Sequence, residues 1–276
     1  MDRSVIRERV EQTGNVSTMP NIVAKLRAMI DNPSASAQSI GDEIGRDQVL
    51  TAKVLRLVNS GFYGFRTPIT TITQAMVLLG FDVIRTLVMS AAVLDILELM
   101  NKSLAGLWEH SVGTAAASNL LAQRLGLANP EEIAVSGLLH DLGKVIIAQR
   151  FPAEHTLIRT QVDERNCLQI QAEREVLGVT HAEVGLWLLR RWGLPSKLTA
   201  PIAFHNNFHP TREHADRTAV VHIANIISRA RGLGFPGDRR IPAIDRRAWH
   251  LLDLEMSLIR EVTVQLDAEL ADTPFA

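Results

Sequence analysis

The sequence predicts an all-α protein, because helical signals recur along the chain and strand signals are scarce. Leu50, Val54, Leu57 and Val58 follow the spacing of one apolar helix face. Residues that favour helix starts and ends separate such segments along the chain. Tyrosine occurs once, and no run of alternating apolar and polar residues is bounded by hairpin turns.

Two helices are predicted in the N-terminal third. The apolar stripe of residues 50–58 stops at Asn59-Ser60-Gly61, residues that tolerate the left-handed conformation of a helix end. Thr71 and Gln74 have the spacing of a capping box. This pattern predicts the start of a long helix that runs towards Met100.

Start signals are stronger in the remainder of the chain. Asn129, Pro130 and the acidic pair that follows them predict a helix that carries residues 137–147. Thr180 and Glu183 form a second capping box, whose helix ends near Trp192. Further helices are predicted at 104–125, 195–205, 211–227 and 246–270, with a loop at 232–242.

Composition excludes several classes of function. The 276 residues include 29 basic and 30 acidic side chains, so no general attraction to nucleic acid or to an anionic membrane is expected. The single cysteine, Cys167, excludes an internal disulfide and a Cys-rich zinc site. The charged N-terminus has no signal-peptide pattern, and no apolar run is long enough to span a bilayer. We therefore expect a cytoplasmic protein without membrane contact.

Several histidines lie where a surface residue is not expected. His110, His181 and His205 share helical stripes with apolar residues, and the adjacent pair His140–Asp141 lies among core-type residues. On one continuous helix this pair would point about 100° apart, so a shared metal ion would lie in the wedge between them. The helix start near His181 is expected to favour its neutral, metal-binding form.

Imidazole and carboxylate together suit one divalent ion of iron, zinc, manganese or magnesium. The alternative stays open, because a buried histidine is more commonly a hydrogen-bonded core residue. Gly137 and Gly143 flank the pair and would permit the close approach of a neighbouring helix. Four further histidines are expected to be surface or capping residues: His155, His209, His214 and His250.

Six segments in order resemble the HDOD family, a branch of the HD superfamily. They are MP at 19–20, DQVLTAKVLRLVNS at 47–60, ITQAMVLLG at 72–80, LWEHS at 107–111, GLLHDLGK at 137–144 and WGLP at 192–195. The resemblance implies an all-α domain at 12–210, with an N-terminal helical subdomain (12–100) packed on an HD-like core (101–210). A C-terminal helical extension would cover 211–276. It also implies a role in bacterial signal transduction.

The resemblance to metal-dependent HD phosphohydrolases also assigns roles to individual residues. Their ligand motif falls on the metal candidates His110, His140, Asp141, His181 and His205, and a lysine that contacts phosphate falls on Lys144. Two ligand positions differ from the motif, since they are occupied by Asn206 and Asn225. The Gly-Tyr-Pro element of cyclic di-GMP phosphodiesterases is missing, because the only tyrosine is Tyr63. A complete two-metal phosphodiesterase is therefore not expected.

Competing functions follow from this incomplete motif. The favoured hypothesis is a regulatory domain that binds signalling proteins or senses a nucleotide ligand, with a partial metal site. The alternative is an enzyme, a mononuclear phosphohydrolase or phosphodiesterase acting on a nucleotide. Its metal would be bound by His110, His140, Asp141 and His181, while Lys144 and His205 hold phosphate. Nucleic-acid binding through the arginines of 229–247 is not expected, because such a segment is more commonly a solvated loop.

Overall fold

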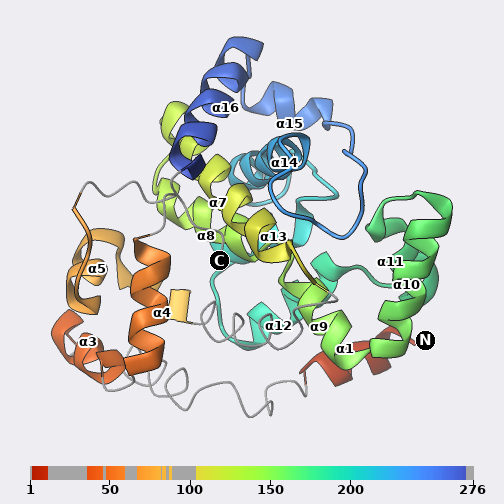
Figure 1. The fold of residues 1–276 in the computed structure, drawn as a ribbon, viewed down its shortest axis with the longest axis horizontal. Helices are drawn as coiled ribbons and strands as arrows, with labels where there is room; N and C mark the ends of the chain where they lie inside the picture. Colours follow the sequence, from red (N-terminus) through yellow and green to blue (C-terminus); the bar gives the residue numbers. More distant parts are fainter. Residues whose placement is uncertain are drawn as a thin grey trace.

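The computed structural model describes residues 2–11, 36–45, 48–59, 67–81, 83–84, 87–88 and 104–271. These residues form helices and connecting loops without a β-strand, so the predicted fold class is confirmed (Figure 1). The helices are α1 (Arg3–Glu11), α3 (Ala37–Gly45), α4 (Gln48–Val58), α5 (Ile72–Leu79), α7 (Leu107–Arg124), α8 (Pro130–Leu139), α9 (Leu142–Arg150), α10 (Pro152–Arg165), α11 (Gln169–Leu177), α12 (His181–Arg191), α13 (Ser196–Phe204), α14 (Ala215–Ala230), α15 (Arg246–Leu251) and α16 (Met256–Ala271).

Helices α3, α4 and α5 pack on one another and form a group at one side of the molecule (Figure 1). The predicted capping box opens α5, where the Thr71 hydroxyl accepts a hydrogen bond from the Gln74 backbone N–H at 3.1 Å. The prediction of one continuous helix that runs from this capping box towards Met100 is wrong. The helix ends at Leu79 because Gly80 has a φ of 81°, outside the helical range. Residues 89–100 lie outside the described residues.

Helix α7 is the central helix of the group formed by α7 to α16. It packs against α8, α14 and α16, and almost all of its side chains are buried because neighbours cover it on several sides. Helix α13 packs on α8, α12 and α14, and α12 packs on α9. This packing brings the C-terminal end of α13 and the start of α12 towards the junction of α8 and α9.

The helix predicted through residues 137–147 is divided. Helix α8 ends at Leu139, α9 begins at Leu142, and Asp141 leaves helical geometry with φ −102° and ψ 9°. His140 and Asp141 therefore lie at a turn and not on one continuous helix, so the expected 100° separation does not apply. The turn gives the Asp141 carboxylate a direction that an unbroken helix would not provide.

The C-terminal prediction also requires a correction. The expected helix 246–270 is two helices, α15 and α16, with Asp253 at φ 47° between them. Helices α1, α3, α10 and α11 were not predicted. Helix α1 packs on α9 and α12, so residues before the predicted boundary at 12 contribute to the core.

Candidate metal centre

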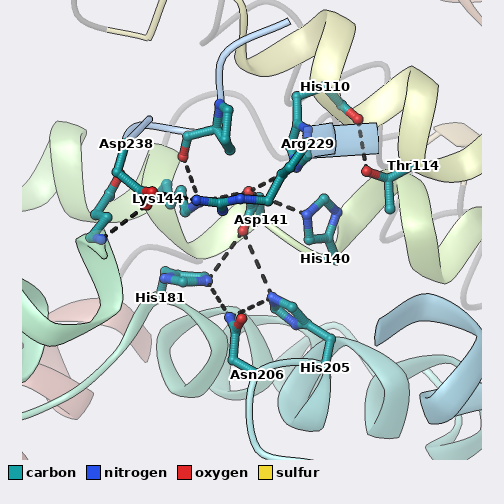
Figure 2. Close-up of polar contacts among 12 residues, drawn as sticks. His110, Thr114, His140, Asp141, Lys144, His181, His205, Asn206, Arg229 and Asp238 are labelled. Atoms are coloured by element: carbon teal, nitrogen blue, oxygen red, sulfur yellow. Dashed lines mark hydrogen bonds and ion pairs between the residues drawn. The ribbon is translucent and has the colours of Figure 1, made fainter. Parts of the chain in front are cut away.

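The structure brings together all five predicted metal candidates (Figure 2). His110 lies in the first turn of α7, and His140 and Asp141 lie at the α8–α9 turn. His181 is the first residue of α12, and His205 follows the last residue of α13. Each of the five is at most 2% exposed, so the cluster lies within the protein.

Asp141 is the centre of the cluster, because each of its carboxylate oxygens faces two imidazoles. Oδ2 lies 3.2 Å from Nε2 of His140 and 3.8 Å from Nε2 of His110. Oδ1 lies 3.2 Å from Nε2 of His181 and 3.9 Å from Nε2 of His205. The aspartate thus joins two groups of potential ligands, one on each side of its carboxylate.

Hydrogen bonds at Nδ1 fix the orientation of three of these rings. Nδ1 of His140 donates to the carbonyl of Gly137 at 2.6 Å, and Nδ1 of His205 donates to the carbonyl of Ile202 at 2.8 Å. Nδ1 of His181 lies 2.6 Å from a carboxylate oxygen of Glu173. Nε2 of each ring is therefore directed towards Asp141, which is the arrangement found at histidine metal ligands.

Glu173 is a functional candidate that the sequence analysis did not identify. Its side chain is fully buried. Oε2 accepts the backbone N–H of His181 at 2.8 Å as well as the ring N–H, while Oε1 accepts from Gln169 at 2.9 Å. A usable signal exists, because Ala172, Glu173 and Leu177 follow helical spacing and place this carboxylate on an apolar stripe.

Lys144 is held inside the protein and not at an open surface. Its ammonium group donates to Oδ2 of Asp141 at 2.7 Å and to the carbonyl of Pro236 at 2.7 Å. Burial alone would raise the pKa of Asp141, but Coulombic interactions with His140 and Lys144 and hydrogen bonds with His140 and His181 outweigh it and hold that pKa well below its usual range. Asp141 is therefore a carboxylate, the form that binds metal.

Protonation differs among the imidazoles. Burial, with a smaller Coulombic effect of His140, lowers the pKa of His110 and of His205 well below the usual value, so both are neutral. Burial also acts to lower the pKa of His181, but the charge of Glu173 and hydrogen bonds to Asp141 and Glu173 raise it overall. The expectation that the helix start favours neutral His181 is therefore wrong for the metal-free chain.

The two departures from the ligand motif have different environments. The Asn206 side-chain amide nitrogen lies 3.1 Å from Nε2 of His181 and 2.6 Å from Nε2 of His205, and it donates to the His205 nitrogen, because that ring carries its proton at Nδ1 (Figure 2). Asn225 is 3% exposed, and its Oδ1 makes no hydrogen bond to any described residue. A side-chain oxygen without a partner is costly in a protein interior, so Asn225 Oδ1 is a buried acceptor that an ordered water molecule would satisfy.

The cluster fits a divalent metal ion. Nε2 of His110 and of His140 also make no hydrogen bond to the described residues. Metal–ligand bonds of about 2.1 Å place neighbouring ligand atoms about 3.0 to 3.4 Å apart, which the shorter separations from Asp141 match. The longer ones require movements of about half an ångström. His110, His140 and Asp141 form one possible ligand group, and Asp141, His181 and His205 form the other.

Close helix packing supports the centre, as expected for the two glycines. A Cβ on Gly143 would lie 1.9 Å from the carbonyl oxygen of His181, so only glycine permits this approach of α9 to α12. A Cβ on Gly137 would lie 2.6 Å from Oγ of Ser118, where α8 meets α7. The prediction of close neighbours at both positions is confirmed.

Two sequence-based expectations fail outside the cluster. His155, expected at the surface, is 7% exposed, and burial lowers its pKa. Arg229, expected in a solvated loop, is buried and forms an ion pair with Asp238. Nearby arginines also have carboxylate partners, since Arg231 bonds to Asp267 on α16.

An all-helical fold around a buried histidine–aspartate centre is the arrangement that an HD-like domain is expected to have. The defining pattern of the HDOD domain matches residues 16–208, and the chain therefore belongs to the HDOD family. None of the described helices has the length and apolar character needed to cross a membrane.

Three relatives illustrate the range of proteins that this chain resembles. A crystal structure of an HDOD domain protein with unknown function from Geobacter sulfurreducens is 28% identical and has a TM-score of 0.70, covering 97% of this chain and 99% of that one. An uncharacterized protein of Treponema pallidum is 27% identical over 81% of this chain and 44% of its own length. Ribonuclease Y of Deinococcus radiodurans is 31% identical over 48% of this chain and 17% of its own length. The chain thus spans less than half of these two curated relatives.

Proposed function

We propose that this chain is a regulatory signalling domain whose His/Asp centre binds one divalent metal ion as a structural or sensing element. Iron, zinc, manganese and magnesium are the candidate ions. The signal would pass through contacts with separate signalling proteins, or through a bound nucleotide. Membership of the HDOD family supports the regulatory role, and the donor set of the centre supports metal binding.

The burial of the centre is the observation that carries this proposal. A metal-dependent hydrolase needs an open coordination position that water and substrate can reach. Here each of the candidate ligand residues is at most 2% exposed. Lys144 donates to Asp141 and to a backbone carbonyl, and Asn206 donates to Nε2 of His205. These bonds favour a closed centre over one arranged for turnover.

Hydrolysis assays on metal-loaded protein test the regulatory proposal. The chain would be loaded separately with Zn²⁺, Mn²⁺ and Fe²⁺ and incubated with bis(p-nitrophenyl) phosphate, nucleoside triphosphates and cyclic dinucleotides. Asp141→Asn serves as the control, because it removes the carboxylate shared by both ligand groups. We expect equal, background rates for both proteins. Saturable, metal-dependent hydrolysis that Asp141→Asn abolishes would contradict the proposal.

A mononuclear phosphohydrolase or phosphodiesterase is the second candidate function. The observation that favours it is the similarity, over part of the chain, to a protein named ribonuclease Y. In this case His110, His140, Asp141 and His181 would bind the metal, while Lys144 and His205 would hold the phosphate. Lys144 would then have to leave the carbonyl of Pro236, and Lys144→Ala would raise the KM for a nucleotide substrate.

A third function, nucleotide sensing without hydrolysis, is distinguished from the metal-binding regulatory domain and from the phosphohydrolase by measuring thermal stabilisation of the chain. A nucleotide that binds the folded chain raises its Tm by mass action even when it is not hydrolysed. We expect Lys144→Ala to weaken such a shift if the phosphate lies at this lysine. A shift that Lys144→Ala leaves unchanged would place the nucleotide elsewhere.

A further inference from the structure

The loop of residues 232–240, which follows α14, lies directly against the His/Asp centre. It is outside the residues that match the HDOD pattern, which end at 208. Pro236 and Asp238 of this loop are buried, although the loop is rich in glycine and charged residues. Its backbone and side chains contact four elements around the centre, which are the start of α7, α9, the start of α11 and the end of α14.

The first contact is with the start of α7, beside the metal candidate His110. The backbone N–H of Phe235 donates to the carbonyl of Gly106 at 2.7 Å. Gly234 has a φ of 63°, and a Cβ there would lie 2.2 Å from the Gly106 oxygen and 2.4 Å from the backbone nitrogen of His110. The loop backbone therefore lies against the backbone that carries His110, with no room for a side chain at 234.

The second contact reaches Asp141 through Lys144. The Pro236 carbonyl accepts from the Lys144 ammonium group, which in turn donates to Asp141, each at 2.7 Å. The cavity between the loop and this lysine has a volume of about 10 Å³, room for about one water molecule. The loop therefore occupies the space through which a larger solute would approach Lys144.

The third contact reaches His181 through a chain of hydrogen bonds. Oδ2 of Asp238 accepts the backbone N–H of Gln169 at 3.0 Å, and the Gln169 amide donates to Glu173 at 2.9 Å. Glu173 then accepts both N–H groups of His181. Asp238 also pairs with Arg229 at the end of α14, which secures the loop at its origin (Figure 2).

We propose that the 232–240 loop is a strap that closes the His/Asp centre to solvent. Release of the strap would separate Pro236 from Lys144 and uncover the face of the centre beside His110. Controlled exchange of the metal ion with solvent is a consequence that rests on the proposed function. Closure itself does not require a metal, so the two can be tested separately.

A pair of glycine substitutions tests closure in the full-length, metal-free chain. Gly234→Ala and Gly232→Ala both place alanine at positive φ, 63° and 68°. Only the first adds a clash, because a Cβ at Gly232 meets no atom within 4 Å. The measurement is the rate at which diethyl pyrocarbonate modifies His110 and His140, mapped by mass spectrometry.

We expect Gly234→Ala to raise these modification rates about tenfold or more, while Gly232→Ala leaves them within about twofold of the wild type. Helical circular dichroism and a cooperative thermal transition establish that each variant is folded. Wild-type rates in folded Gly234→Ala would overturn the strap. Equal acceleration by both substitutions would also overturn it, because the effect would then come from backbone strain alone.

Asp238→Asn provides a second variant that decides the question if Gly234→Ala does not fold. It keeps the size of the side chain and removes the charge that holds Arg229. Asp267→Asn is the matched control, since it removes the partner of Arg231 at an exposed site on α16. Faster modification of His110 in Asp238→Asn than in Asp267→Asn supports the strap, and equal rates contradict it.

Metal release links the strap to the proposed function. Zn²⁺-loaded protein mixed with a chromogenic chelator should lose its ion about tenfold faster in Gly234→Ala than in Gly232→Ala. If none of the proteins retains Zn²⁺ while the histidine modification rates still differ, closure stands and the metal-binding proposal fails. If metal is retained and released at equal rates by both variants, the strap does not control exchange.

Discussion

Glu173→Gln should weaken metal binding without unfolding the protein. Glu173 is fully buried and accepts the ring N–H of His181 at 2.6 Å, which directs Nε2 of that ring towards Asp141. Glutamine has nearly the same shape and retains an oxygen that can accept this bond. The substitution therefore removes the charge of the acceptor and not the contact itself.

The expected magnitude follows from that lost charge. A hydrogen bond to a charged group contributes about 1.5–3 kcal/mol, against about 0.5–1.5 kcal/mol for a neutral pair. The difference of about 1–1.5 kcal/mol corresponds to roughly a tenfold change in affinity. The carboxylate also increases the basicity of a ligating imidazole, and loss of such a partner typically reduces metal affinity by about 10–100-fold. We therefore expect the Kd for Zn²⁺ to rise by about 10–100-fold.

The assay is a competition titration of metal-free protein with Zn²⁺ and a chelator of known affinity. Glu175→Gln is a matched control, because it makes the same substitution on α11 at an exposed residue whose partner is Arg165. We expect this control to bind Zn²⁺ as the wild type does. Equal Zn²⁺ affinity in Glu173→Gln and Glu175→Gln would refute the role assigned to Glu173.

Three further predictions concern the stability of the fold. Asp141→Asn leaves a buried ammonium group without its carboxylate, so the free energy of unfolding should fall by about 3–5 kcal/mol in urea denaturation; a loss below about 1 kcal/mol would contradict the ion pair. Burial lowers the pKa of His155 in the folded chain. As the pH falls, this imidazole is therefore protonated in the unfolded chain before it is protonated in the folded chain. The free energy of unfolding decreases from about pH 6.5 down to the lower folded pKa, by up to about 1.4 kcal/mol per pH unit. His155→Gln should make the decrease in stability between pH 7 and 5 less steep by that amount, and an unchanged slope would show that His155 titrates normally. Gly143→Ala should lower Tm strongly because a Cβ would overlap the backbone of His181, whereas Gly45→Ala, where a Cβ meets nothing within 4 Å, should leave Tm within about 2 °C of the wild type.

The fold class and most of the larger helices could be predicted because their signals are local. The capping box at Thr180 and Glu183 opens α12 as expected. The Thr180 hydroxyl accepts the backbone N–H of Glu183, and the Glu183 carboxylate accepts the backbone N–H of Thr180. Periodicity of apolar residues is likewise contained in each segment. Such features depend on neighbours in the sequence, so one chain is sufficient to reveal them.

The break at His140–Asp141 could not be predicted, because it depends on tertiary contacts. No proline or glycine lies within residues 138–142, and apolar spacing continues through them. The turn directs Asp141 towards imidazoles from three other helices, α7, α12 and the end of α13. Local propensity is overridden there by packing and charge, which a sequence pattern does not contain.

The side chains that gather at the candidate site could be named from the sequence, but the residues that support them could not. The five metal candidates converge as the resemblance implied. Pro236 was missed because its partner Lys144 is 92 residues away in the sequence, and Glu173 was missed because its contact with His181 depends on how α11 and α12 are placed relative to each other. The apolar stripe on α11 could have indicated that Glu173 is buried, but the partners of Glu173 and Pro236 are seen only in the folded chain.

Metal stoichiometry measured by elemental analysis after equilibrium dialysis tests the central claim most directly. The full chain would be dialysed against micromolar Zn²⁺ or Mn²⁺ beside a double variant, His140→Ala with His181→Ala, which removes one imidazole from each side of Asp141. A buried His/Asp metal centre predicts about one ion per wild-type chain and none in the double variant. An absence of bound ion in the wild type, or equal binding by both proteins, would contradict it.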